Sequence, residues 1–157
     1  MYEMRGNRVA PMQEVEISHI ALNVSSILGF NKRNRKHCDR LFEQLSEYGI
    51  IIDPMSDKEW AKYTNDLTRG HFYPPTRTIR IPERIYTMAC RGERDALFVM
   101  LHELGHLFLG HNAVLHNAKE RPTRIEDAEW QADTFAERIL IAVSYTHLRA
   151  HETLANL

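Results

Sequence analysis

The sequence predicts an α+β fold, and three observations support this prediction. Apolar residues recur at helical spacing in several segments along the chain. Two short segments, residues 50–52 and 78–81, instead show the apolar run or the alternation that is typical of strands. A His-Glu-x-x-His motif lies inside an apolar helical segment. We therefore expect several helices packed on a short sheet, with the motif on a buried helix.

The composition is that of one globular domain of 157 residues, with 43% hydrophobic and 26% charged residues. The formal net charge of −1 gives no general attraction to nucleic acid or to an anionic membrane. No apolar run reaches the roughly eighteen residues of a membrane span, and the first residues lack the apolar core of a signal peptide. Cys38 and Cys90 are too few for a disulfide framework. We expect a cytoplasmic protein with reduced thiols and no membrane partner.

Two helices are expected before the first strand. Residues 17–28 carry apolar side chains at helical spacing, and residues 34–48 form a second helical segment that ends at Gly49. The basic cluster at residues 31–36 has no interleaved aromatic residues, so we interpret it as a solvated helix start. No direct binding of nucleic acid is therefore assigned.

The hydrophobic pattern changes after Gly49. Residues 50–52 predict a short buried strand, and residues 57–66 predict a brief helix. Residues 70–77 contain two consecutive prolines, so this segment is expected to be irregular or to lie at a sheet edge. Residues 78–81 alternate and predict another strand, which the following proline stops.

A longer buried helix is expected to carry the motif. Acidic side chains at Glu93 and Asp95 suit its first turn, and Gly110 stands where a glycine commonly ends a helix. Its apolar residues recur at i, i+3, i+4 and i+7 spacing: Ala96, Leu97, Val99, Met100, Leu101, Leu104, Leu107 and Phe108. These apolar neighbours would desolvate a site in the last two turns.

The motif predicts a zinc site that carries its own general base. His102 and His106 are four residues apart, so on a helix they share one face and can reach a single ion. Glu103 is turned by about 100° from His102, which places it beside the ion rather than on it. Two neutral imidazoles suit Zn²⁺, and the glutamate suits the activation of a water molecule.

A second helical segment, residues 125–136, supplies a candidate third ligand. Glu129 and Asp133 are four residues apart and share a face of this helix. We interpret Glu129 as the metal ligand and Asp133 as the acceptor for the free ring N–H of one of the two histidines, which would fix its tautomer. Residues 112–124 are expected to form a loop that brings the two helices together.

The two segments HELGHLFLGH and EWQADTFAERIL, with the short spacing between them, resemble the ImmA/IrrE family of metallopeptidases. The resemblance implies a small zincin-like domain of the gluzincin kind. It also implies that His102, His106 and Glu129 bind zinc and that Glu103 is catalytic. Residues 78–82 match the position of the strand before the zinc helix in such domains.

The resemblance, which we place over residues 17–141, also suggests a substrate. Members of the family are associated with prophage and mobile-element regulation or with stress responses, and several act on helix-turn-helix repressors. The expected activity is hydrolysis of peptide bonds in an intracellular protein, with such a repressor as the expected partner. The alternative is a non-catalytic, zinc-stabilised regulatory protein that binds a partner without cutting it. Glu103 favours the enzyme, because a purely structural site would not need it.

Other side chains are weaker site candidates. His111 lies about half a turn out of phase with His102, so capping or packing is favoured over metal binding. His116 falls in the expected loop and is interpreted as an exposed residue. Three side chains are candidate donors to a developing oxyanion: His71, Tyr73 and Tyr86.

The last fourteen residues, 144–157, depart from the family pattern and read SYTHLRAHETLANL. This stretch resembles a peptide that arises when sequencing-adapter sequence is translated. We therefore expect a single domain at residues 1–143, followed by a tail of doubtful, non-native origin. His147 and His151 are four residues apart, but no acid stands in the catalytic place, so both are left out of the site.

Overall fold

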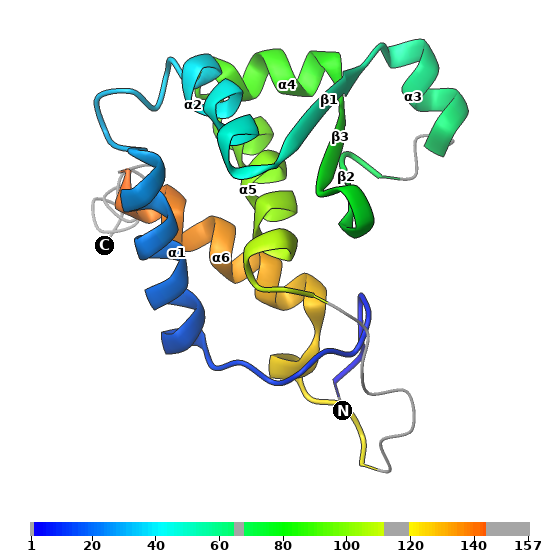
Figure 1. Cartoon of the computed structure of the whole chain (residues 1–157). Coiled ribbons are helices and arrows are strands. Elements are labelled where there is room, and N and C mark those ends of the chain that lie inside the picture. The colour runs from blue at the N-terminus through cyan, green and yellow to red at the C-terminus, as the bar shows by residue number, and fades with distance from the viewer. Residues whose placement is uncertain (1, 65–67, 112–119, 144–157) are drawn as a thin grey trace, which may run out of the picture.

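A small sheet lies to one side of a group of helices in the computed structural model of the chain, which describes residues 2–64, 68–111 and 120–143 (Figure 1). The α-helices are α1 (Glu14–Leu28), α2 (Asp39–Gln44), α3 (Asp57–Thr64), α4 (Glu83–Cys90), α5 (Arg94–Phe108) and α6 (Ala128–Ala142). The strands are β1 (Ile51–Met55), β2 (His71–Tyr73) and β3 (Thr78–Pro82). Short 3₁₀ helices are η1 (Leu45–Tyr48), η2 (Pro74–Thr76) and η3 (Arg124–Glu126). The predicted α+β fold is confirmed. None of the described helices is long and apolar enough to cross a membrane.

The sheet has the order β1-β3-β2, with β3 in the middle. β1 runs parallel to β3 and β2 runs antiparallel to it. The predicted edge position of the proline-containing segment is confirmed, because β2 lies at an edge of the sheet, pairs with β3 and ends at Tyr73, just before Pro74. The expected burial of residues 50–52 is wrong for Ile51, which is 51% exposed. The reason is that β1 also lies at an edge of the sheet, where β3 is its single partner strand in the part of the chain that the structure describes.

The helix predicted over residues 34–48 is shorter than expected. It begins at Asp39 as α2 and continues as η1, which ends at Gly49 in the left-handed conformation, with φ of 75°. Asparagine side chains explain the late start. Asn31 Oδ1 accepts hydrogen bonds from the N–H groups of Arg33 and Asn34, and Asn34 Oδ1 accepts one from Asn31. Such side-chain bonds to the local backbone compete with helix formation.

Helix α4 was not predicted from the sequence. It follows β3 directly, with Pro82 at its N-cap position, and has only eight residues. Only Ile85 and Ala89 are fully buried on it, so its apolar stripe is too short to show a clear helical period. The acid at Glu83, just after a proline, is the signal that could have identified its start.

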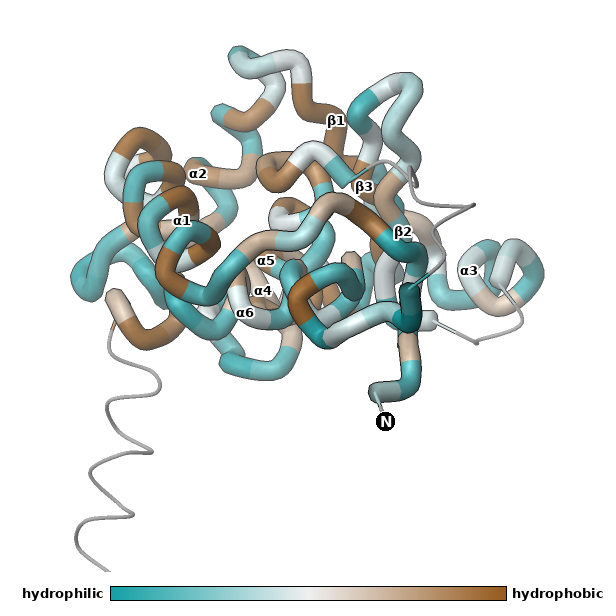
Figure 2. The backbone as a smooth tube through the Cα atoms, turned by 90° about the horizontal axis from the view of Figure 1, so that it is seen from below, coloured by the Kyte–Doolittle hydropathy of each residue, from teal (hydrophilic) through white to brown (hydrophobic). Residues whose placement is uncertain are grey.

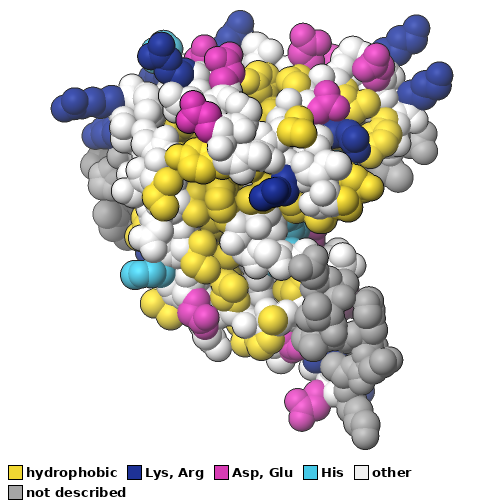
Figure 3. Space-filling view, viewed as in Figure 1, with side chains coloured by type: hydrophobic (Ala, Val, Ile, Leu, Met, Phe, Trp, Pro, Cys, Tyr) yellow, Lys and Arg dark blue, Asp and Glu magenta, His cyan; other side chains and the backbone are white. Residues whose placement is uncertain are grey.

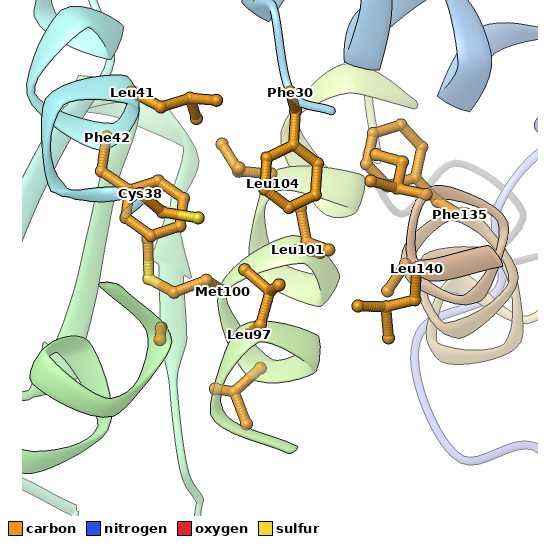
Figure 4. Close-up of a cluster of buried hydrophobic side chains, with 14 of the residues drawn as sticks. Phe30, Cys38, Leu41, Phe42, Leu97, Met100, Leu101, Leu104, Phe135 and Leu140 are labelled. Carbon is orange, nitrogen blue, oxygen red and sulfur yellow. The ribbon is translucent and has the colours of Figure 1, made fainter. Parts of the chain in front are cut away.

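Helix α5 passes through the centre of the core. Figure 4 shows Leu97, Leu101 and Leu104 on α5, with Phe42 of α2 to one side and Phe135 of α6 to the other. On α1 the hydropathy alternates along the helix (Figure 2), because one face packs on α6 and the other meets solvent. The buried position that was predicted for the motif helix is confirmed.

α5 and α6 come close together at Gly105, inside the motif. A Cβ atom at this position would lie 3.1 Å from Cδ1 of Phe135 and 3.2 Å from both Cα and the carbonyl oxygen of Ala132. Glycine in a helix interior costs about 1 kcal/mol relative to alanine. Here the missing side chain allows the two backbones to approach, and Glu129 then lies one turn before the contact, facing α5.

We predict that Gly105→Val lowers the free energy of unfolding by about 1 to 3 kcal/mol, because its extra methyl groups must displace the backbone of α6. Gly105→Ala should have a smaller effect, since better helix propensity opposes the closer contact. Urea unfolding of the three proteins measures the difference. An unchanged midpoint for the valine variant would show that the helices do not meet closely at this position.

Candidate metal centre

Three side chains from two helices meet at one point. His102 and His106 lie one turn apart near the end of α5, and Glu129 lies in the first turn of α6. His102 Nε2 is 2.7 Å from Glu129 Oε2, and His106 Nε2 is 3.4 Å from Glu129 Oε1. The two Nε2 atoms are 3.2 Å apart. The structure therefore brings together the three residues that were predicted as ligands.

This group has the donor set of a metal site. One ligand atom from each side chain lies within 4.8 Å of the other two, and no other group of this kind occurs among the described residues. Two imidazole nitrogens and one carboxylate form the protein ligand set of many catalytic zinc sites. Zinc suits these donors better than magnesium or calcium, which prefer oxygen ligands. The residues present thus fit a zinc ion.

The ring of His102 is held between two carboxylates. Its Nδ1 atom is 2.7 Å from Asp133 Oδ1, on the opposite side of the ring from Glu129. Burial disfavours the charged imidazole, but the hydrogen bonds with Asp133 and Glu129 outweigh it and raise the pKa of His102 to about 10. The pKa of Glu129 is lowered, mainly by its hydrogen bonds with His102 and His106. Asp133 therefore lies where the sequence interpretation placed it, beside a histidine of the cluster.

His106 is held by a chain of neutral groups. Its Nδ1 atom is 2.8 Å from Nδ1 of His111, and His111 Nε2 is 2.7 Å from Oε1 of Gln131. Burial lowers the pKa of His111 to about 4, so its ring is neutral near pH 7. With Nε2 of His106 directed at the cluster, Nδ1–H of His106 donates to His111, which donates through Nε2–H to Gln131.

His111 lies outside the ligand cluster, as expected, but its role is more specific than packing. It orients His106 in the way that Asp133 orients His102. Gln131 was missed by the sequence reasoning. It is buried in the first half of α6, and no spacing rule distinguishes it from an ordinary helical glutamine.

Glu103 is buried beside the cluster rather than within it. Its side chain is 6% exposed, and Oε2 has no hydrogen-bond partner among the described residues. Burial raises the pKa of Glu103, although the neighbouring histidines oppose the shift. Gly70 packs closely over it, since a Cβ there would lie 3.1 Å from Glu103 Cγ. A buried carboxylate oxygen without a hydrogen-bond partner is costly, so it points to a functional role.

A cavity of about 710 Å³ opens at the cluster. In Figure 3 the molecule is hollowed beside the sheet, and a histidine side chain is visible in the hollow. The lining comes from five regions: Asn7 and Val9, residues 68–72 with Pro74, the motif helix from Phe98 to His106, His111, and the start of α6. The three candidate ligands, Glu103 and the cavity thus share one site.

Of the three candidate oxyanion donors, His71 lines the cavity and the two tyrosines do not. The Nδ1 atom of His71 is buried without a partner among the described residues, and burial lowers the pKa of its ring. Tyr73 instead lies 5.6 Å from the guanidinium of Arg80, and Tyr86 packs against Phe42. Three other histidines that the sequence offers as weaker site candidates fall outside the described residues: His116, His147 and His151.

A comparison with protein-family models shows to which family the chain is related. The family model of the Peptidase M78 group, described as the IrrE N-terminal-like domain, matches residues 47–154, more than half of the chain. The chain belongs to this family. The predicted ImmA/IrrE relationship is therefore confirmed, and membership supports a peptidase activity.

The IrrE-like match differs in extent from the resemblance seen in the sequence. It begins at residue 47 rather than 17 and ends at residue 154 rather than 141. Its last part overlaps the proposed tail, residues 144–157, which lies outside the described residues. Comparisons with curated proteins and with solved structures found no match.

Asp127 fixes the start of α6 in this IrrE-like domain. Its fully buried carboxylate accepts the N–H of Glu129 at 2.9 Å, as an N-cap residue does. It also accepts hydrogen bonds from the backbone N–H groups of Arg5 and Gly6 and from the hydroxyl of Tyr2. Burial alone would raise the pKa of Asp127, but these bonds outweigh it and hold the pKa below its usual value.

We predict that Asp127→Ala lowers the free energy of unfolding by about 2 to 4 kcal/mol near pH 7, because the helix cap is lost and buried donors lose their acceptor. The folded-state pKa is lowered, so this contribution is complete above the unfolded-state pKa. It is lost as the pH falls through the folded-state pKa. Urea unfolding over a range of acidic pH measures this loss. The free energies of unfolding of wild type and Asp127→Ala should converge as the pH falls.

Asp57→Ala is the matched control. Asp57 is an exposed acid in the first turn of α3, so its removal should change stability by no more than about 0.5 kcal/mol. Equal losses in both variants would contradict the special role of Asp127.

Proposed function

We propose that this protein is a zinc-dependent metallo-endopeptidase that hydrolyses peptide bonds of an intracellular protein. One observation carries the proposal: the ligand cluster lines the same cavity as Glu103, whose buried Oε2 atom has no hydrogen-bond partner among the described residues. A structural zinc site would be closed and would need no base. Membership in a peptidase family supports the same reaction class.

Each side chain then has a defined task. When bound, zinc would supply Lewis-acid polarisation of the scissile carbonyl and activation of a water molecule. Glu103 accepts a proton from the attacking water and delivers it to the leaving amine. Burial of this carboxyl raises its pKa, which makes it a better proton acceptor near neutral pH. Asp133 and His111 hold the two histidine rings in the required orientation.

The sheet favours an extended peptide as the substrate. Among the described residues β2 pairs with β3 on one side only, and its residues His71 and Phe72 line the cavity. A strand edge of this kind can pair with an extended segment of another chain through main-chain hydrogen bonds. By resemblance to the family, the substrate that we propose is a helix-turn-helix repressor of a prophage, mobile element or stress regulon, with the enzyme in the cytoplasm.

We predict one zinc per chain, with stoichiometric zinc lost in His106→Ala, because one of two imidazole ligands is removed. Metal analysis after dialysis against trace zinc measures the content. His19→Ala, which changes an exposed histidine on α1, should keep the full content. Full zinc content in His106→Ala would exclude this residue from the site.

We also predict that Glu103→Gln keeps zinc but lowers hydrolysis by about 10²-fold or more, because the amide has a similar size but cannot accept the proton. Zinc content and the rate of substrate cleavage are measured on the same preparations. Wild-type rates in the variant would show that Glu103 is not the base.

Glu103→Gln also provides a route to the substrate. Proteins that co-purify with this variant from its host are identified by mass spectrometry and incubated with zinc-loaded wild-type protein. Cleavage of a captured protein by wild type but not by the variant supports the peptidase. Capture without any cleavage favours a zinc-stabilised protein that binds its partner without cutting it.

A further inference from the structure

The first residues of the chain lie along the start of α6 (Figure 1). We call residues 2–12 the strap. Its backbone is bonded to the segment before α6, from Val9 N–H to the carbonyl oxygen of Glu126 at 2.8 Å and from Met12 N–H to that of Ile125 at 3.0 Å. The strap lies outside the part of the chain that the family model matches.

One hydrogen-bonded chain links the strap to His102. The ring Nδ1 of His102 meets Asp133 Oδ1 at 2.7 Å, and the other oxygen of Asp133 meets Nη2 of Arg5 at 2.8 Å. Arg5 therefore holds the carboxylate that holds the ring. The contact carries opposite charges, so it also balances the charge of Asp133.

A second chain links the strap to His106. It runs through His111 and Gln131, whose Nε2 donates to the carbonyl oxygen of Ala10 at 3.0 Å and to that of Ile125 at 2.7 Å. Because these two carbonyl groups fix the amide nitrogen of Gln131 as the donor, its Oε1 atom faces His111 and accepts a hydrogen bond from His111 Nε2–H. Through Gln131, the strap thus helps to set the tautomers of His111 and His106.

The third candidate ligand is in direct contact with the strap. A Cβ atom on Gly6 would lie 2.6 Å from Cγ of Glu129 and 3.3 Å from its backbone nitrogen. Gly6 and Glu129 also donate their N–H groups to the same oxygen of Asp127. The side chain of Glu129 therefore has its position only because residue 6 has no side chain.

We propose that the strap is an outer layer of the metal centre, in which Arg5 and Gly6 are positioning residues that set the affinity and geometry of zinc binding. The inference rests on the proposed function, because it concerns the same site. Groups around the direct ligands fix ring orientation and tautomer, and their loss weakens metal binding even when every ligand remains. The three ligands are backed by one segment, so displacement of that segment disturbs all of them together.

The test measures zinc affinity by competition with a chromophoric chelator for wild type, Arg5→Ala, Arg5→Lys and Gly6→Ala. The visible absorption of the cobalt(II)-substituted proteins provides a second readout, which reports ligand geometry without any need for catalytic activity. Arg94→Ala is the matched control. This change removes an ion pair between Arg94 and Glu137 of α6, whose length of 2.9 Å is close to that of the pair between Arg5 and Asp133. Glu137 lies one turn beyond Asp133 and outside the cluster.

We expect Arg5→Ala to weaken zinc binding by about tenfold and Gly6→Ala by about 10- to 100-fold, with changed cobalt spectra in both. Arg5→Lys should recover part of the affinity, because it restores a positive charge near Asp133. Arg94→Ala should keep wild-type affinity and spectrum. Circular dichroism establishes that each variant is folded. If Gly6→Ala does not fold, the zinc affinity and cobalt spectrum of Arg5→Ala alone test the proposal.

Two results would overturn the inference while leaving the proposed function intact. One is wild-type zinc affinity and cobalt spectrum in folded Arg5→Ala and Gly6→Ala. The other is an equal loss in Arg94→Ala, which would indicate a general effect of stability. Failure of the wild-type protein to bind zinc would overturn the proposed function and this inference together.

Discussion

The close packing of α5 against α6 is the constraint on which the rest of the structure depends. The two helices approach at Gly105, where the missing side chain admits the backbone of Ala132. This contact brings Glu129 to within hydrogen-bond distance of His102. The same contact forms part of the core, so the site is built on two rigid elements rather than on a loop. Rigid support of this kind holds a metal site at the required geometry.

The electrostatics of the site follow from burial and from the pairing of charges. His102 lies between the carboxylates of Glu129 and Asp133, each of which accepts a hydrogen bond from a ring nitrogen of His102. Glu103 lies close by but keeps one oxygen without a partner among the described residues. Two carboxyl groups on neighbouring helices, α5 and α6, thus have opposite shifts of pKa, with that of Glu129 lowered and that of Glu103 raised. These opposite shifts suit the roles that we propose for the two groups, with Glu129 as a metal ligand and Glu103 as the proton acceptor.

The parts of the fold that were predicted well are those with a long local pattern. α5 shows helical periodicity over fifteen residues, and its end is marked by Gly110 in the left-handed conformation, with φ of 63°. α4 and the late start of α2 were not predicted. α4 is too short for its period to be visible, and the turn before α2 depends on side-chain bonds of Asn31 and Asn34 that compete with a helix.

The sequence by itself determined the direct members of the candidate site. His102, Glu103 and His106 are related by helical geometry, and Glu129 and Asp133 are related in the same way, so local spacing places each set on one face. Only the tertiary structure decided what supports them. Gly6 meets Asp127 across 121 positions of sequence, and Gln131 meets Ala10 across the same separation. No periodicity links residues so far apart, because their contact depends on how whole elements pack.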